Sequence, residues 1–426
     1  MMKLKKWLGT LGFTTLLVGG ILSGCSSNDT SSNDSSNKSS STSDEPVEIT
    51  LSGWGASPEE SKLLQETLDA FEEKYPNIKV KHDVVSDQYM DVMKTRLIGG
   101  EAADVFYLDA FEAPGLIETG VLEPLDQYIT EDFDMGDFEK PLLEAFQKDG
   151  STYGLPKGYS TLALFYNKKM FNDAGVEVPQ TWDELETVAK KLTTGTDVYG
   201  FGAAPELARL YFIGESKGGK IVEDNKAAFG DDQVVKALQP YVDMHNVDKS
   251  SAQPNEVGAN WGGEMFGQGK AAMVLEGNWA IPFLDDTFPD LEYGTSEVPT
   301  ITGEKGTMAF TVAYVMNAAS EKKEASWKLI EFLTGKDGME IWTSKGFELP
   351  SRKSVAEKLG WADDELRSAL VAGAPYATVW QQGTNLPIIT NNFNNQVTSA
   401  FLGARPLDEA LKEAEQQANK EIENQQ

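Results

Sequence analysis

The sequence is short of cysteine and histidine, with one cysteine, Cys25, and two histidines in 426 residues. A single thiol cannot form a disulfide within the chain, and His82 and His245 lack the close spacing of a His/Cys metal site. Arginine is also scarce and occurs at scattered positions: Arg96, Arg209, Arg352, Arg367 and Arg405. Phosphate sites favour converging guanidinium groups, so we do not expect a phosphorylated ligand.

Basic residues are outnumbered by acidic residues over the whole chain. The chain carries 37 Lys and Arg against 67 Asp and Glu, which gives a formal charge of −30. Nucleic acids and anionic lipid surfaces require clustered Lys and Arg, so neither is an expected partner. The sequence also lacks a complete phosphate-binding glycine-rich loop, and we expect no cofactor.

Long apolar runs are absent except at the N-terminus. There, Lys3, Lys5 and Lys6 precede an apolar segment that ends in Leu22-Ser23-Gly24-Cys25. This segment is shorter than the roughly 20 residues that span a bilayer, and its order of parts is typical of an export signal. The final four residues resemble the bacterial lipobox, in which the cysteine is acylated after cleavage. We therefore expect residues 1–24 to be a lipoprotein signal peptide and Cys25 a lipid anchor, a buried free thiol being the alternative.

Residues 25–45 follow as a Ser- and Asn-rich linker, and 26–45 contain no apolar side chain. Such a segment cannot bury enough surface to fold, so we expect a disordered tether to the extracytoplasmic face of the bacterial cell membrane. The remaining 380 or so residues exceed what one hydrophobic core usually serves, and two lobes are expected. We expect a monomer, because both lobes must move freely.

The pattern after residue 46 predicts an α/β fold. Residues 47–51 alternate as a strand, and Ser57-Pro58-Glu59-Glu60 then opens a helix with a capping box. The apolar run 105–108, bounded by Asp104 and Asp109, indicates a strand buried on both faces. Strand, helix, strand, helix, strand implies a sheet covered by helices, with ligands beyond the carboxyl ends of its strands.

The same order restarts with a strand at 162–166, and Thr181-Trp182-Asp183-Glu184 opens a further helix with its own capping box. Further strands are predicted at 271–275 and 313–315, and helices near 321–334, 336–344 and 406–423. Three tryptophans within helical patterns are expected in the core: Trp182, Trp327 and Trp342.

Six motifs in a fixed order carry a resemblance to a known family. They are ADVFYLD at 103–109, YGLP at 153–156, LFYNK at 164–168, PQTWDEL at 179–185, FGQGKAAM at 266–273 and EGNW at 276–279. From about residue 46 to 420 the chain resembles the extracellular solute-binding proteins of carbohydrate ABC importers, which include maltose- and multiple-sugar-binding proteins.

The resemblance implies a two-lobed, periplasmic-binding-protein-like fold of type II, in which each lobe is a sheet flanked by helices and a hinged cleft lies between them. Lobe one would combine 46–157 with 300–350, and lobe two 158–299 with 351–426. It further implies a binding protein without enzymatic activity that captures a neutral sugar, best taken as an oligosaccharide, and delivers it to the transmembrane subunits of an ABC permease.

A neutral sugar needs aromatic platforms and hydrogen-bonding groups. Trp54 lies in a Gly-flanked loop after the first strand, Trp279 matches a position where the family commonly places a stacking aromatic, and Asp109 ends a buried strand. The competing interpretations are loop packing for Trp54, core packing for Trp279 and a helix cap for Asp109. The remaining candidates are Glu59, which also suits the first turn of a helix, and the aromatic residues Tyr159, Phe310 and Trp380.

Three alternatives stay open at this point. A lipid-anchored glycoside hydrolase needs two carboxylates roughly 5 to 10 Å apart, which this acidic chain has in abundance. A binding protein for a non-sugar solute and a lipid-anchored surface adhesin are the others. Tight binding of a sugar that is recovered intact would separate a sugar-binding protein from all three.

Overall fold

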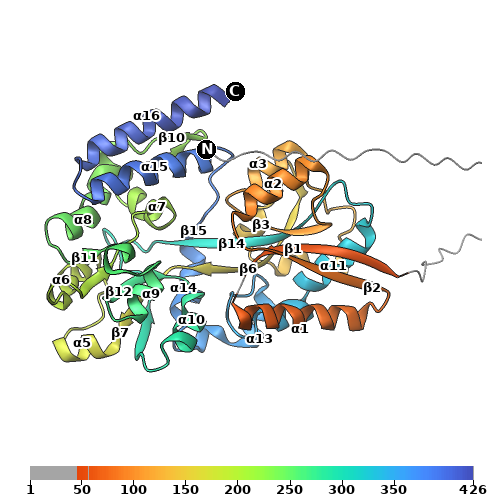
Figure 1. Cartoon of the computed structure of the whole chain (residues 1–426), viewed down its shortest axis with the longest axis horizontal. Helices are drawn as coiled ribbons and strands as arrows, with labels where there is room; N and C mark the ends of the chain where they lie inside the picture. Colours follow the sequence, from red (N-terminus) through yellow and green to blue (C-terminus); the bar gives the residue numbers. More distant parts are fainter. Residues whose placement is uncertain (1–45, 56, 426) are drawn as a thin grey trace, which may run out of the picture. The chain divides into compact units, whose positions relative to one another are not determined.

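The computed structural model describes residues 46–55 and 57–425. The predictions of a signal peptide at 1–24, of the linker at 25–45 and of acylation at Cys25 lie outside the described residues. The described chain begins as the alternation of strands and helices predicts: β1 (Val47–Trp54), α1 (Pro58–Lys74), β2 (Ile78–Val85), α2 (Tyr89–Gly99) and β3 (Val105–Asp109). Strand β1 pairs in parallel with β2 on one side and with β3 on the other (Figure 1).

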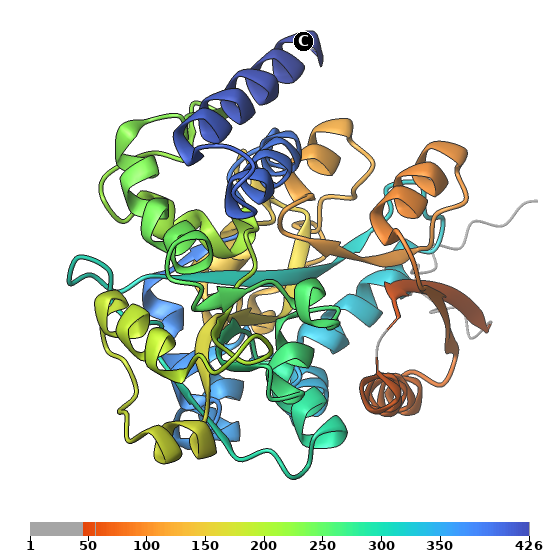
Figure 2. The same ribbon diagram turned by 60° about the vertical axis from the view of Figure 1, so that its left-hand side comes forward.

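The first sheet continues with strands from much later in the chain. Strand β3 pairs antiparallel with β14 (Thr307–Met316), which pairs antiparallel with β6 (Gly154–Thr161) and in parallel with β15 (Ala377–Val379). Figure 2 shows β14 as one long cyan strand. We call this sheet, with α1, α2, α3 (Ala113–Thr119), α11 (Lys323–Thr334) and α12 (Lys336–Thr343), lobe one.

A second sheet forms the centre of what we call lobe two. Its strand order is β11 (Ser251–Ala252), β8 (Tyr199–Gly202), β12 (Ala271–Glu276), β7 (Ala163–Asn167) and β13 (Tyr293–Ser296). Strands β8, β11 and β12 are parallel, whereas β7 runs antiparallel to both β12 and β13. The chain enters this sheet directly from β6, because only Leu162 separates β6 from β7.

Helices that contact the second sheet come from both halves of the sequence. They are α5 (Lys168–Ala174), α6 (Trp182–Leu192), α8 (Asp232–Asn246) and α9 (Gly262–Gly267), while α7 (Leu207–Glu215) packs against α8 and α10 (Ala280–Thr287) against α9. The C-terminal pair α15 (Leu386–Phe401) and α16 (Leu407–Gln425) packs against α8, and α15 also contacts α7. Helices α13 (Lys353–Leu359) and α14 (Ser368–Gly373) lie between α10 and α15 in the sequence. Helix α14 contacts both β6 and β7.

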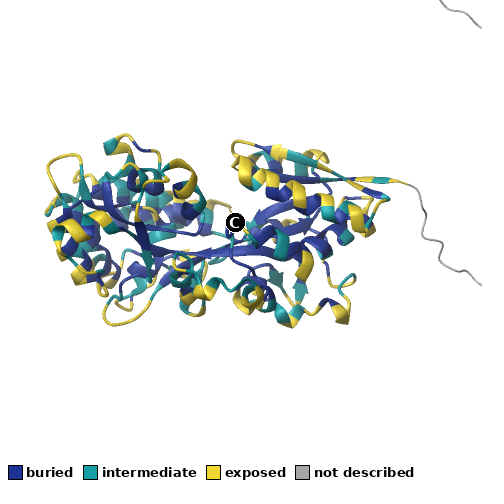
Figure 3. Cartoon of the chain, turned by 90° about the horizontal axis from the view of Figure 1, so that it is seen from below, coloured by how far each residue is buried: buried dark blue, intermediate teal, exposed yellow. Residues whose placement is uncertain are grey.

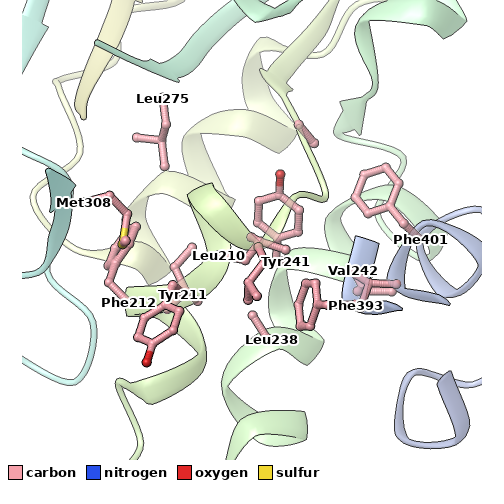
Figure 4. Close-up of a cluster of buried hydrophobic side chains, with 14 of the residues drawn as sticks. Leu210, Tyr211, Phe212, Leu238, Tyr241, Val242, Leu275, Met308, Phe393 and Phe401 are labelled. Carbon is pink, nitrogen blue, oxygen red and sulfur yellow. The ribbon is translucent and has the colours of Figure 1, made fainter. Parts of the chain in front are cut away.

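Each sheet has its own hydrophobic core. Phe71 and Phe106 belong to the core of lobe one, and Tyr241 and Phe393 to that of lobe two, part of which Figure 4 shows. A third cluster, which includes Tyr159 and Ala309, lies where β6 and β14 lead from one sheet toward the other. Figure 3 shows that the strands are mostly buried and that exposed residues concentrate on outer helices and loops.

Local sequence signals account for several of these elements. Helix α6 begins with the predicted capping box, because Thr181 accepts a hydrogen bond from the Glu184 N–H and the Glu184 carboxylate accepts one from the Thr181 N–H. At α1 only half of the predicted box forms: Ser57 Oγ accepts the Glu60 N–H at 3.1 Å, while the Glu60 side chain lines a cavity described below. Within the described residues, no helix has both the length and the apolar character needed to cross a bilayer.

Candidate functional site

A cavity of about 500 Å³ lies between lobe one and lobe two. Lobe one contributes Trp54 at the end of β1 and the first turn of α1, and lobe two contributes Trp279 and α10. Strands β6 and β14 form part of its wall together with the segment 347–348. This volume is in the range of small-ligand sites, which are usually concave and partly apolar.

Trp54 is held by two tyrosines from the neighbouring elements. Its ring makes edge contacts with Tyr89, at a centroid distance of 5.4 Å, and with Tyr107, at 5.2 Å. Gly53 permits this arrangement, since a Cβ there would lie 2.7 Å from the Tyr107 ring. The Tyr89 hydroxyl in turn binds the backbone of Ser52 and Tyr107. Trp54 is thus a half-buried ring on a rigid aromatic support.

Trp279 faces it from the motif at 276–279. Gly277 is required there, because any Cβ would meet the Trp279 ring and Ser160 Oγ. Asn278 is fully buried, and its N–H donates to Ser160 Oγ at 3.1 Å while its amide donates to the Phe347 carbonyl. The motif therefore connects lobe two to β6 and to the segment 347–348, and it leaves the Trp279 ring at the cavity.

The buried carboxylate of Glu276 fixes the Trp279 ring. Its Oε2 accepts the Trp279 Nε1–H at 3.0 Å and a guanidinium N–H of Arg209, from α7, at 2.9 Å. Burial raises the pKa of Glu276, and the Arg209 charge opposes that rise. Arg209 also contacts Glu206 at 3.0 Å. The indole of Trp279 consequently has one preferred orientation.

Tyr159 and Phe310 lie on the two strands that run between the sheets. Phe310 of β14 pairs with Ser160 of β6, and its ring contacts Trp279 edge to face at 5.8 Å. Tyr159 is buried, and a pair of backbone hydrogen bonds to Leu349 holds its strand. Burial raises the pKa of the Tyr159 hydroxyl, so it stays protonated at neutral pH. Both residues line the cavity.

Glu59 and Glu60 lie in the first turn of α1, where carboxylates also suit the helix dipole. Both line the cavity, Glu59 as an exposed side chain and Glu60 as a partly buried one. Burial raises the pKa of Glu60, the Lys157 charge lowers it and the Glu348 charge raises it. The four acidic residues at the cavity are Glu59, Glu60, Asp286 and Glu348, and no Lys or Arg is among its lining residues in the described chain.

Asp109 and Trp380 lie together outside this cavity. Asp109 Oδ1 accepts the Phe111 N–H at 2.9 Å, and the Phe111 ring stacks on Trp380 at 5.4 Å with an interplanar angle of 5°. Trp380 is 6% exposed and also contacts Tyr211. Burial raises the pKa of Asp109 to about 6. Asp109 therefore supports the turn before α3 without capping the helix, whose N-cap residue is Glu112, and a ligand role for either residue remains a prediction.

Similarity to known proteins identifies the family of the chain. Residues 55–340 match the family described as bacterial extracellular solute-binding protein. The chain belongs to this family. A Brucella abortus protein named as a binding protein is 29% identical over 389 residues, which cover 88% of this chain and 92% of that protein. The arabinooligosaccharide-binding protein of Bacillus subtilis is 24% identical over 91% of this chain and 88% of its own.

A solved structure supports the same assignment. The chain is similar to an ABC substrate-binding protein from Listeria monocytogenes that was solved in complex with cycloalternan, with a TM-score of 0.81 and 26% identity. The match covers 89% of this chain and 99% of that one. The two-lobed, periplasmic-binding-protein-like fold predicted from the sequence is confirmed. The lobe boundaries predicted from the sequence are not tested by these matches and stay a prediction.

Family membership also decides between the broad classes of function. The solute-binding protein acts outside the cytoplasm and binds a solute for an ABC importer; it is not an enzyme, and a glycoside hydrolase is not favoured. Among the described residues, no group of three His, Cys, Asp or Glu side chains is placed to hold a metal ion. The chemistry of the cavity is therefore that of recognition.

The sequence analysis missed several residues at the cavity of this solute-binding protein. They are Ser160, Pro282, Phe283, Asp286, Thr287, Thr311, Phe347 and Glu348. Those on α10 were detectable in principle, because a helix that begins directly after Trp279 presents the residues of its next turns near the same surface. Phe347 and Glu348 lie in an irregular segment, and no local pattern signals their position.

A second cavity of about 510 Å³ lies in lobe two, next to the buried ion pair. Arg209 and Trp261 line it, together with the amides of Gln253, Asn255, Asn260, Asn394 and Asn395. Glu276 contacts Arg209 on this side and Trp279 on the side of the first cavity. One buried carboxylate thus links the walls of the two cavities.

Proposed function

We propose that this solute-binding protein captures a neutral oligosaccharide at the outer face of the cell membrane and delivers it to the transmembrane subunits of an ABC permease. The observation that carries the proposal is the composition of the first cavity. Two tryptophans, Trp54 and Trp279, approach it from opposite lobes, and Phe310 contacts the second of them. Aromatic faces of this kind pack against the C–H faces of sugar rings.

The polar groups of the cavity agree with a neutral ligand. Carboxylates such as Glu59 accept hydrogen bonds from hydroxyls, whereas a phosphate or carboxylate on the ligand would meet four acidic side chains. The Listeria monocytogenes structure holds cycloalternan and the Bacillus subtilis relative is named for arabino-oligosaccharides, so oligosaccharides are the ligand class we propose here.

The proposed mechanism uses the two strands that run between the lobes. A sugar that contacts Trp54 on lobe one and Trp279 on lobe two would stabilise a closed arrangement by its higher affinity for that state. Segments 158–163, 298–309 and 350–352 are the proposed hinges. The closed, monomeric protein would then dock on the permease.

Intrinsic tryptophan fluorescence tests the proposal. Residues 46–426 are titrated with arabinotriose, maltotriose, mannotriose and cycloalternan, and the sugars are analysed afterwards. Saturable binding of an intact sugar is expected. Binding of a phosphorylated sugar together with no response to these four would contradict the choice of a neutral ligand, and release of new reducing ends would contradict a binding role.

We further propose that residues 1–24 are removed as a signal peptide and that Cys25 is acylated and anchors the protein. The support is the sequence pattern described above. A Cys25→Ser variant of the full chain is expected to leave the membrane fraction and to enter the medium or remain as an uncleaved precursor. Equal membrane retention of the variant in mature form would contradict a lipid anchor.

A further inference from the structure

A buried lysine lies behind the cavity wall in lobe one. Lys157 of β6 is 1% exposed, and its Nζ is 3.0 Å from Glu348 Oε1. The same Nζ lies over two aromatic rings, 4.6 Å from the centroid of Tyr107 and 4.0 Å from that of Trp342. A lysine loses most of its hydration when it is buried, so these contacts must replace it.

Glu348 is held at both carboxylate oxygens. Its Oε1 faces Lys157 at 3.0 Å, and its Oε2 accepts the Trp342 Nε1–H at 2.9 Å. The side chain remains 20% exposed and lines the cavity. Gly158 provides the space for it, because a Cβ at that position would lie 2.5 Å from Glu348 Oε2 and 2.8 Å from Glu348 Cβ. The carboxylate therefore has a fixed place and retains lone pairs for a ligand.

A second carboxylate, that of Glu60, lies in the first turn of α1. This carboxylate lines the same cavity and interacts electrostatically with both Lys157 and Glu348. The phenols of Tyr107 and Tyr314 are the other titratable groups close to these charges. Burial raises the pKa of both phenols, so they stay neutral near physiological pH. Lys157 thus forms an ion pair with Glu348, and its charge also acts on Glu60.

We propose that Glu60 and Glu348 form a hydroxyl-recognition pair at the lobe-one end of the cavity, and that Lys157 is the positioning residue that orders it. The inference rests on the proposed function, since it assigns the acceptors for hydroxyls of the same sugar. Lys157 does not line the cavity and acts through Glu348. The Tyr107 ring beneath Lys157 also supports Trp54, so the same cluster sets an aromatic platform and its hydrogen-bond acceptors.

The structure also fixes the sign of a pH effect. A carboxylate accepts hydroxyl hydrogens in its ionised form, and burial and Glu348 both raise the pKa of Glu60 while Lys157 lowers it. Removal of the lysine charge should raise the pKa of Glu60 further. Binding should then be lost on acidification at a higher pH than in the wild type. A lysine that only fills space would not move this pH profile.

The test measures sugar affinity from pH 5 to 8 with whichever sugar of the four-member panel the wild type binds. The variants are Glu348→Gln, Lys157→Met and Lys157→Arg, with Lys323→Met as the matched control. Lys323 forms an ion pair with Glu123 at 2.7 Å, and neither residue lines the cavity. We expect Glu348→Gln and Lys157→Met to weaken binding about tenfold or more.

Lys157→Met should also move the acidic loss of binding to higher pH, Lys157→Arg should restore much of the affinity, and Lys323→Met should match the wild type. If Lys157→Met does not fold, the sugar affinity of Glu348→Gln and the pH dependence of sugar binding by Lys157→Arg test the inference instead. Wild-type affinity in a folded Glu348→Gln protein, or an unchanged pH profile in folded Lys157→Met, would overturn this inference and leave the proposed function standing. A wild type that binds no oligosaccharide would overturn the proposed function and this inference with it.

Discussion

Replacement of Glu276 by glutamine is the sharpest perturbation of the cavity wall. The side chain is 1% exposed, and one of its oxygens accepts hydrogen bonds from both Arg209 and Trp279. Glutamine has nearly the same size, so no cavity is created. The glutamine carbonyl oxygen can accept the same two hydrogen bonds, but it carries no negative charge, so both bonds lose their charge assistance and Arg209 loses a buried partner charge.

The size of the effect follows from these contacts. Loss of a charge-assisted hydrogen bond costs about 1.5 to 3 kcal/mol, and breaking a buried ion pair about 3 to 5 kcal/mol. Arg209 keeps Glu206 at 3.0 Å and its side chain is 20% exposed, which places the expected loss nearer the lower end. We expect Glu276→Gln to lower the free energy of unfolding by about 2 to 3 kcal/mol.

Urea unfolding followed by circular dichroism measures this loss, and a sugar titration measures the second effect. Because the Trp279 N–H loses a charged acceptor and the ring is held less firmly, affinity should fall by about 1 kcal/mol, or about fivefold. Glu206→Gln is the matched control: its side chain is 53% exposed, and a change below about 0.5 kcal/mol is expected. Wild-type stability and affinity in Glu276→Gln would refute the role given to this carboxylate.

Three further predictions concern the neighbouring residues. Burial raises the pKa of Asp109 from 3.8 to about 6, so the folded state binds its proton more tightly and stability should fall as the pH rises through this range. Asp109→Asn should remove this dependence and be about 1 to 2 kcal/mol more stable than wild type at pH 7.5 but not at pH 4, as urea unfolding at both pH values would show. Gly53→Ala should cost about 1 to 3 kcal/mol, because its Cβ would lie 2.7 Å from the Tyr107 ring, whereas Gly55→Ala, with its nearest neighbour at 3.8 Å, should match wild type in the same assay. Trp54→Ala should weaken sugar binding about tenfold in a calorimetric titration, and an unchanged affinity would remove Trp54 from the site.

Local patterns predicted the regular elements of the fold well. The apolar run at 105–108 is the central strand β3, and the helices predicted at 336–344 and 406–423 are α12 and α16. Trp182, Trp327 and Trp342 are each less than 10% exposed, as their helical positions indicated. These features depend on neighbours within a few residues, which the sequence displays directly.

The cavity itself could be predicted only in part. Trp54, Glu59, Tyr159, Trp279 and Phe310 all line it, because each lies at or after the end of a strand or on a strand that runs between the sheets. Asp109 and Trp380 do not line the cavity. The Asp109 carboxylate accepts a hydrogen bond from the Phe111 N–H, and the Trp380 ring stacks on the Phe111 ring.

The acceptor pair could not be predicted, because its members meet only in the folded chain. Glu60 has the sequence context of a capping box, yet it lines the same cavity as Glu348 of a distant segment and feels the charge of Lys157 of β6. Lysine in a predicted strand is usually a surface residue, and the Glu348 carboxylate together with the aromatic faces of Tyr107 and Trp342 explains the burial of Lys157.

The central claim is that an oligosaccharide binds between Trp54 and Trp279. The most direct measurement is the fluorescence titration of residues 46–426 with the four neutral oligosaccharides, with the bound sugar analysed after each titration. We expect a saturable change with one or more of them and recovery of intact sugar, and we expect a Trp54→Ala and Trp279→Ala double variant to lose binding in a calorimetric titration with the same sugar. An unchanged affinity in a folded double variant, or no response to any of the sugars, would contradict this claim.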